Sequence, residues 1–178
     1  MDKPASHKWA MRGLYGALAV FVLFLHLLPL ETQPDRWPFP DFLIVLTFAW
    51  VLRRPDYVPT VLVALVMLLA DLLLQRPPGL LAALVVLGAA YLRSAAPGMR
   101  DAGFVAEWMS VSAVVAGVFL GNRVILAILS VDQAALLPVM IQLVLTILAY
   151  PVIVLLSQSV FGVRRVSAAD ASAAGARA

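Results

Sequence analysis

The chain has 178 residues, of which 63% are hydrophobic and 13% are charged, and its mean hydropathy is +0.97. A water-soluble domain normally carries about 25% charged residues, so the composition excludes an ordinary soluble globular domain. The net charge of +3 comes without a basic stripe interleaved with aromatic residues, so nucleic acid is not an expected partner. The lack of cysteine excludes thiolate catalysis, iron–sulfur ligation and disulfide bonds.

Apolar runs recur along the chain, and several approach the roughly 20 residues that a helix needs to cross the hydrocarbon core of a membrane. We therefore expect an all-α integral membrane protein, with six transmembrane helices in residues 1–158 and a disordered cytoplasmic tail over residues 159–178. The N-terminal segment begins with basic charge and continues apolar, but no small-residue cleavage pattern follows. It is therefore expected to be a retained first helix rather than a signal peptide.

The first two predicted helices differ in length. The first spans about residues 9–28 and ends before a polar, proline-rich loop, and the second spans about residues 41–52. At about 1.5 Å per residue, the second helix reaches roughly 18 Å, which is less than the roughly 30 Å of hydrocarbon. It is therefore expected to be a re-entrant element or to lie where the protein thins the bilayer.

Four further helices are predicted, over about residues 57–74, 80–93, 102–120 and 134–157. The pair Tyr150-Pro151 predicts a kink in the last of them. The end of the fifth helix is ambiguous. If it extends to residue 129, Arg123 lies deep, faces the bundle and needs a carboxylate; if it stops at Gly121, Arg123 reaches out to the surface. We favour the second alternative.

The basic residues predict the orientation, since short cytoplasmic loops carry an excess of lysine and arginine. In a six-helix topology, ten of the 13 basic residues fall on the side of both termini, and the other side holds only Arg36, Arg76 and Arg123. Both termini are therefore expected to be cytoplasmic. The tryptophans fit an aromatic belt, with Trp9, Trp50 and Trp108 at the inner interface and Trp37 at the outer one.

Asp71 lies in the strongly apolar run LVMLLADLLLQRPPGLL. Two roles are open for this carboxylate: it could relay a proton or an ion, or it could cap the helix that follows the turn and pair with Arg76 at the interface. We favour the structural role, because a relay usually needs a second ionisable group within the membrane and none is evident in the sequence. In this role Asp71 would position the turn that ends at Gly79.

Two further acidic residues lie near predicted helix starts. Asp41 begins the second helix, where a carboxylate suits the unpaired N–H groups and the positive end of the helix dipole. We expect it to be a cap rather than a catalytic group. Glu107 lies one turn into the fifth helix, and we expect it at the inner interface or in contact with Arg93.

Few residues in the sequence suggest catalysis or metal binding. The two histidines, His7 and His26, fall on opposite sides, so no metal cluster is predicted. Ser110 and Ser112 have no base nearby and are expected to bond back to their own helix. The sequence also lacks a phosphate-binding glycine loop and a paired-carboxylate motif. We therefore expect no enzymatic activity and no cofactor. The small-residue pairs could let helices approach closely; they are Gly13 with Gly16 and Gly117 with Gly121.

Several residues between positions 37 and 92 form a pattern that is defined by their order and spacing. It comprises Pro40-Asp41, a short apolar helix ending in Trp50-Val51-Leu52, the turn RRPDYVP, Leu69-Ala70-Asp71, Gly79 and Ala90-Tyr91-Leu92. In order and spacing, this segment resembles the MreD family of rod shape-determining proteins, and the six segments and Tyr150-Pro151 also fit. Family members often carry glycines before the aspartate, where this chain has Val63 and Met67.

The resemblance implies a non-enzymatic scaffold in the bacterial inner membrane that binds MreC. Through MreC it would help to organise RodA, a class B penicillin-binding transpeptidase and the MreB filament, and so support lateral peptidoglycan synthesis and rod shape. The family is also similar in fold to the substrate-binding subunits of ECF vitamin transporters. The alternative function is therefore a small-ligand binding subunit of an energy-coupling transporter.

Overall fold

The computed structural model describes residues 3–28, 38–99, 103–131, 133 and 135–163. These residues form six α-helices and one short 3-10 helix, with no strand among them. The helices are α1 (Lys3–Leu27), α2 (Phe42–Arg53), α3 (Thr60–Leu73), α4 (Leu80–Ala95), α5 (Phe104–Ile128) and α6 (Leu136–Ser159), and η1 (Pro55–Tyr57) joins α2 to α3. The all-α expectation is thus confirmed for the described residues. The expected disordered tail lies largely outside them.

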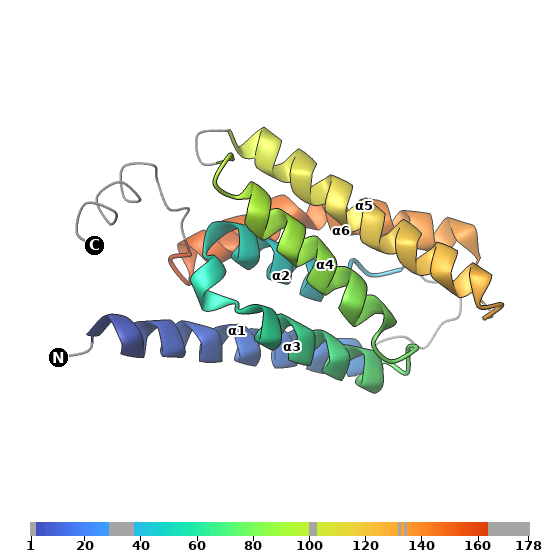
Figure 1. The fold of residues 1–178 in the computed structure, drawn as a ribbon, viewed down its shortest axis with the longest axis horizontal. Helices are drawn as coiled ribbons and strands as arrows, with labels where there is room; N and C mark the ends of the chain where they lie inside the picture. The colour runs from blue at the N-terminus through green and yellow to red at the C-terminus, as the bar shows by residue number, and fades with distance from the viewer. Residues whose placement is uncertain (1–2, 29–37, 100–102, 132, 134, 164–178) are drawn as a thin grey trace.

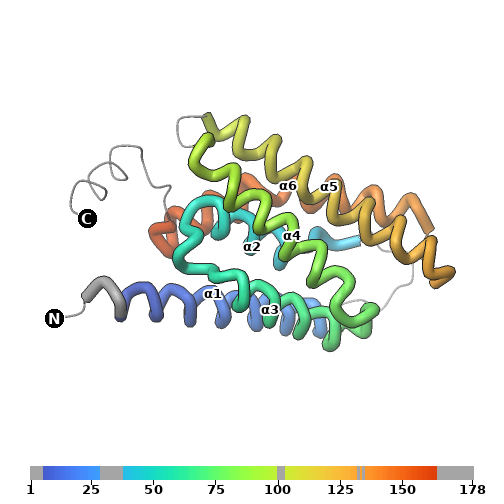
Figure 2. Tube along the Cα trace, viewed as in Figure 1, coloured from blue at the N-terminus to red at the C-terminus, as the bar shows by residue number. Residues whose placement is uncertain are grey.

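Successive helices run in alternating directions along one bundle (Figure 1). α1 therefore begins at the same end of the bundle at which α6 ends. From α3 onward, neighbours in sequence are also neighbours in space: α3 packs on α4, α4 on α5, and α5 on α6. Figure 2 shows the α1–α3 pair on one side and the α5–α6 pair on the other, with α2 and α4 between them.

The short helix α2 is the centre of the bundle. Every residue from Leu43 to Arg53 is buried, and the helix contacts α1, α4, α5 and α6. A helix that is apolar all round and enclosed by protein has no lipid-facing side. The short length of α2 is therefore compatible with a helix that protein encloses on all sides.

The surrounding helices bury one narrow stripe each. In α1 the buried residues recur every four positions, at Met11, Tyr15, Ala19 and Leu23. The buried residues of α5, at spacings of three or four, also lie on one face: Glu107, Val111, Val115 and Val118. Large apolar side chains on the other faces remain exposed, on every helix except α2, as Val61, Leu87, Ile128 and Leu155 illustrate.

Among the described residues, three helices are long and apolar enough to cross a membrane. They are Ser6–Leu27 within α1, Phe104–Ile128 and Leu136–Ser159. Together with the exposed apolar faces, they indicate a membrane protein. At about 1.5 Å per residue, α3 and α4 measure roughly 21 and 24 Å, so they are shorter than a full span of roughly 30 Å.

Several helix boundaries differ from the predictions. The first helix was expected from about residue 9, but α1 begins at Lys3. The third helix was expected to begin near Tyr57, but the chain forms η1 there and α3 begins at Thr60, directly after Pro59. Proline lacks an N–H and suits the entry to a helix rather than its interior. The preference for ending the fifth helix at Gly121 was wrong, because α5 continues to Ile128.

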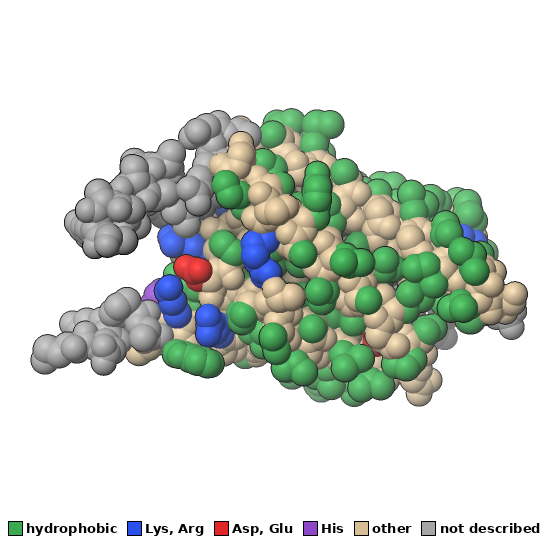
Figure 3. Space-filling view, in the orientation of Figure 1, with side chains coloured by type: hydrophobic (Ala, Val, Ile, Leu, Met, Phe, Trp, Pro, Cys, Tyr) green, Lys and Arg blue, Asp and Glu red, His purple; other side chains and the backbone are tan. Residues whose placement is uncertain are grey.

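Basic side chains lie at both ends of the bundle. Lys8, Arg12, Arg53, Arg54 and Arg93 lie at the end where α1 begins, and Figure 3 shows basic side chains gathered there. We call this end the Arg53 end. The opposite end, at the turn between α3 and α4, holds Arg76 and Arg123, and we call it the Arg76 end.

Candidate functional site

At the Arg53 end, a buried ion pair connects α2 to α5 and α6. Arg53 binds Glu107 through two hydrogen bonds of 2.8 and 3.1 Å, and their side chains are only 3% and 0% exposed. Tyr150 donates its hydroxyl hydrogen to the same carboxylate. The side chain of Gln158 lies beside this group, in the wall of the adjoining cavity. Arg53, Glu107 and Tyr150, from three helices, thus satisfy one another.

The contact predicted for Glu107 from the sequence was wrong. It was expected at the interface or against Arg93, yet it is fully buried against Arg53. Arg93 instead donates to the backbone oxygen of Val58 at 2.7 Å and to the hydroxyl of Thr60. Arg93 therefore ties the end of α4 to the entry of α3.

Trp50 also departs from its expected place. It is fully buried at the centre of the bundle rather than at the lipid interface, and its indole N–H donates to the Ser157 hydroxyl at 3.1 Å. Trp9 is 69% exposed near the start of α1, whereas Trp108 is half-buried and donates to the backbone oxygen of Ile147. Trp37 lies outside the described residues.

A cavity of about 310 Å³ adjoins the ion pair. It is lined by Arg53, Phe104, Glu107, Pro151, Val154, Leu155 and Gln158. Pro151 lies inside α6, which continues on both sides of it. The predicted pair Tyr150-Pro151 thus places one residue in the ion-pair network and the next in the cavity wall.

Asp71 caps the start of α4. Its Oδ2 atom accepts from the backbone N–H groups of Gly79, at 3.0 Å, and Ala82, at 3.1 Å. Gly79 has a φ of +87°, a left-handed conformation that glycine adopts without steric cost. The expected cap is confirmed. The expected pairing with the Arg76 side chain is wrong, because only the backbone N–H of Arg76 reaches Asp71, through the Asp71 backbone oxygen.

The Arg76 side chain instead approaches Asp41, and their closest charged atoms are 3.5 Å apart. Asp41 caps α2 as expected, since its Oδ1 accepts from the N–H of Ile44 at 3.2 Å. The backbone N–H of Asp41 donates to the hydroxyl of Thr146 at 2.9 Å. Asp41 thereby connects the start of α2 with α6 and with the α3–α4 turn.

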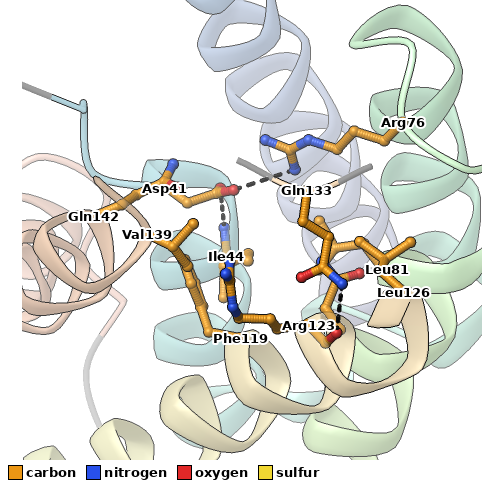
Figure 4. Close-up of a pocket in the computed structure, with 11 residues that line it drawn as sticks. Asp41, Ile44, Arg76, Leu81, Phe119, Arg123, Leu126, Gln133, Val139 and Gln142 are labelled. Atoms are coloured by element: carbon orange, nitrogen blue, oxygen red, sulfur yellow. Dashed lines mark hydrogen bonds and ion pairs between the residues drawn. The ribbon is translucent and has the colours of Figure 1, made fainter. Parts of the chain in front are cut away.

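A pocket of about 220 Å³ surrounds this contact (Figure 4). Arg76 and Asp41 point toward one another across it, and Arg123 extends into it from α5. Gln133 donates to the backbone oxygen of Arg123 at 3.2 Å. The remaining lining residues are Ile44, Leu81, Phe119, Asn122, Leu126, Val139 and Gln142.

Arg123 is therefore placed as in the alternative that we did not favour. It lies on a continuous α5, is partly buried, and lines a pocket that contains the carboxylate of Asp41. The eight residues singled out in the sequence divide into three groups: Trp50, Tyr150 and Pro151 near the Arg53 end, Asp71 and Gly79 at the α4 cap, and Asp41, Arg76 and Arg123 around the pocket.

Sequence reasoning missed the polar stripe of α6. Gln142, Thr146 and Tyr150 recur every four residues and so share one helix face. Gln142 lines the pocket, Thr146 binds Asp41, and Tyr150 binds Glu107. The signal was present in the spacing, because polar residues repeating at this period within an apolar helix predict a face turned toward other polar groups.

The serines of α5 bond back to their own helix as expected, with Ser110 donating to Ala106 and Ser112 donating to Trp108. Within the described part of the chain, no group of three histidine, cysteine or acidic side chains could hold a metal ion. Comparison with protein-family models, curated proteins and solved structures gives no match for this chain.

Proposed function

We propose that this protein is a multi-pass scaffold of the bacterial inner membrane that binds MreC and supports lateral peptidoglycan synthesis and rod shape. It would act without catalysis. RodA and a class B penicillin-binding transpeptidase would be organised indirectly, through MreC, and MreB would lie on the cytoplasmic side. The bilayer itself is the medium that the exposed apolar faces require.

One observation carries this proposal. The residues of the MreD-like pattern serve to assemble the bundle: Asp41 caps the central helix, Trp50 fills its core, and Asp71 holds Gly79 at the α4 cap. If the residues of the pattern stabilise the fold, the protein is expected to act by binding partners at its surface. An enzyme's pattern would be expected to converge on reacting groups.

The apolar surface supports a helical partner. A partner's single transmembrane helix would be held by close packing and small residues rather than by charge. On α1, a side chain added at Gly13 or Gly16 would meet nothing within 4 Å among the described residues. A stretch of helix backbone is thus open to a neighbouring helix on this side of the bundle.

The orientation follows from the basic residues. We place the Arg53 end in the cytoplasm, because its loops carry the excess of lysine and arginine. All six helices would then cross or enter the membrane, with α3 and α4 shorter than a full span and α2 enclosed by the others. Both termini would be cytoplasmic.

Conditional depletion in the native host tests the proposal. We expect depleted cells to lose rod shape and to incorporate less new peptidoglycan along their side walls. Plasmid-borne wild type and Asp71→Asn should both restore rods, because asparagine retains an oxygen that can accept from Gly79. Depleted cells that remain rods, or an Asp71→Asn variant that reaches normal membrane levels without restoring rods, would contradict the proposed role.

A second candidate function is the binding of a small ligand for an energy-coupling transporter. The pocket at the Arg76 end favours it, since two arginines, one aspartate and three side-chain amides line it. Its volume of about 220 Å³ is below the roughly 300–1,000 Å³ typical of sites for drug-sized ligands. This function therefore ranks second.

A further inference from the structure

The pocket at the Arg76 end contains more hydrogen-bond donors than its own acceptors use. Asp41 supplies the carboxylate, and its two oxygens already face the Ile44 N–H and the Arg76 guanidinium. Arg76 carries five N–H donors, yet its side chain has one ion-pair contact, at 3.5 Å, and it is 32% exposed. Most of its donors therefore remain available to a group that enters the pocket.

Further polar groups line the pocket. Asn122 and Gln142 bring amide groups, and the guanidinium of Arg123, which has an interaction of its own, enters from α5. Gln133 holds the backbone of Arg123, which fixes the start of the loop after α5 against the pocket. Guanidinium groups bind carboxylates and phosphates through two parallel hydrogen bonds, so a wall of this kind favours an oxyanion over a cation.

We propose that the pocket at the Arg76 end binds the oxyanion of a small phosphate- or carboxylate-bearing group, with Arg76 as its main ligand. Leu81, Phe119 and Leu126 line the same pocket and would contact an apolar stem attached to that group. The volume of about 220 Å³ suits a headgroup-sized moiety rather than a larger molecule. The inference is independent of MreC, since it concerns a pocket away from the α1 surface at Gly13 and Gly16 and a different type of contact.

Two sources could present this chemistry: a free anion or the headgroup of an anionic lipid. Delipidated protein in neutral detergent should be titrated with inorganic phosphate, with succinate, and with short-chain phosphatidylglycerol, using short-chain phosphatidylcholine to test the need for net negative charge. Thermal unfolding and microscale thermophoresis would measure binding. Stabilisation by phosphate or succinate indicates a site for free anions, and stabilisation by phosphatidylglycerol alone indicates a lipid site; either supports the proposal.

Matched variants decide whether the pocket is responsible. Arg76→Gln should weaken binding about tenfold or more, because a charge-assisted hydrogen bond is worth about 1.5–3 kcal/mol. Arg76→Lys should lose less, since it retains the charge. Arg12→Gln, which removes a cation at the opposite end of the bundle, should bind as wild type does. The proposal is overturned if no anion binds, or if Arg76→Gln with an unchanged unfolding temperature binds as tightly as wild type.

Discussion

The two ends of the bundle each contain an arginine–carboxylate pair, but the pairs differ in geometry and burial. Arg53 and Glu107 meet at 2.8 and 3.1 Å with side chains almost completely buried. Arg76 and Asp41 meet at 3.5 Å, and the arginine is 32% exposed beside a pocket. The first pair uses its hydrogen-bonding capacity within the fold, whereas the second keeps donors available. A pair of the first kind stabilises helix packing, and a pair of the second kind suits ligand binding.

Removing one member of the Arg53–Glu107 pair should have the largest effect. Glu107→Leu leaves the Arg53 charge buried without its carboxylate, and such a change costs about 3–5 kcal/mol of unfolding free energy. Unfolding in mixed micelles would measure it.

The double variant Arg53→Met with Glu107→Leu is the matched control. It removes both charges and should recover most of the lost stability, because a buried ion pair is often replaceable by apolar residues. Equal stability of wild type and Glu107→Leu would show that the pair does not hold the helices together, and the contrast between the two ends would fail.

The Asp71 cap, at the turn between α3 and α4, should come second. Asp71→Leu leaves the N–H groups of Gly79 and Ala82 without their shared acceptor, so we expect a loss of about 2 kcal/mol and less folded protein in the membrane. Asp71→Asn should lose less. Quantitative blotting of membrane fractions and unfolding in detergent would check this order, and a stable Asp71→Leu variant would contradict it.

A pair of glycines tests the packing midway along the bundle, away from both charged ends. A Cβ atom at Gly88 would lie 2.7 Å from Val114 and 3.0 Å from Phe48, so Gly88→Ala should cost about 1–3 kcal/mol. Gly117→Ala meets nothing within 4 Å and should be neutral or stabilising by up to about 1 kcal/mol. Thermal unfolding of both variants compares them directly. If both behave alike, the close contact of α4 with α5 and α2 is absent.

Arg76→Gln should cost less stability than Glu107→Leu, Asp71→Leu or Gly88→Ala. The Arg76–Asp41 contact is 3.5 Å long and the Arg76 side chain is 32% exposed, so the unfolding free energy should fall by about 1 kcal/mol, less than for the fully buried Arg53–Glu107 pair. The same unfolding assay used for Glu107→Leu provides the comparison. A loss of unfolding free energy as large as that of Glu107→Leu would mean that both ion pairs stabilise the fold equally.

The sequence predicted local features better than distant contacts. The existence of six helices, the Asp41 cap and the Asp71 cap all depend on residues within about a dozen positions of one another. The Arg53–Glu107 pair spans 54 positions, and charge alone could not distinguish Arg53 from Arg93 as the partner. The Arg76–Asp41 contact was missed for the same reason, since the nearer Asp71 was the simpler partner.

The central position of α2 in the bundle could not be predicted from the sequence either. In a soluble protein, a helix that is apolar all round is buried in the core. In a membrane protein, lipid-facing and core-facing residues are both apolar, so hydropathy does not separate α2 from its neighbours. Trp50 was misplaced by this ambiguity: a tryptophan at a helix end fits the interface belt, yet its indole lies in the core against Ser157.

The most direct test of the proposed scaffold is a pull-down of the tagged protein from its native membrane in mild detergent, with co-purifying proteins identified by quantitative mass spectrometry. We expect MreC to be enriched together with proteins of the elongation complex, relative to an unrelated tagged membrane protein. Recovery of an ATPase pair and an energy-coupling membrane subunit, without MreC, would contradict the scaffold and assign the protein to a transporter.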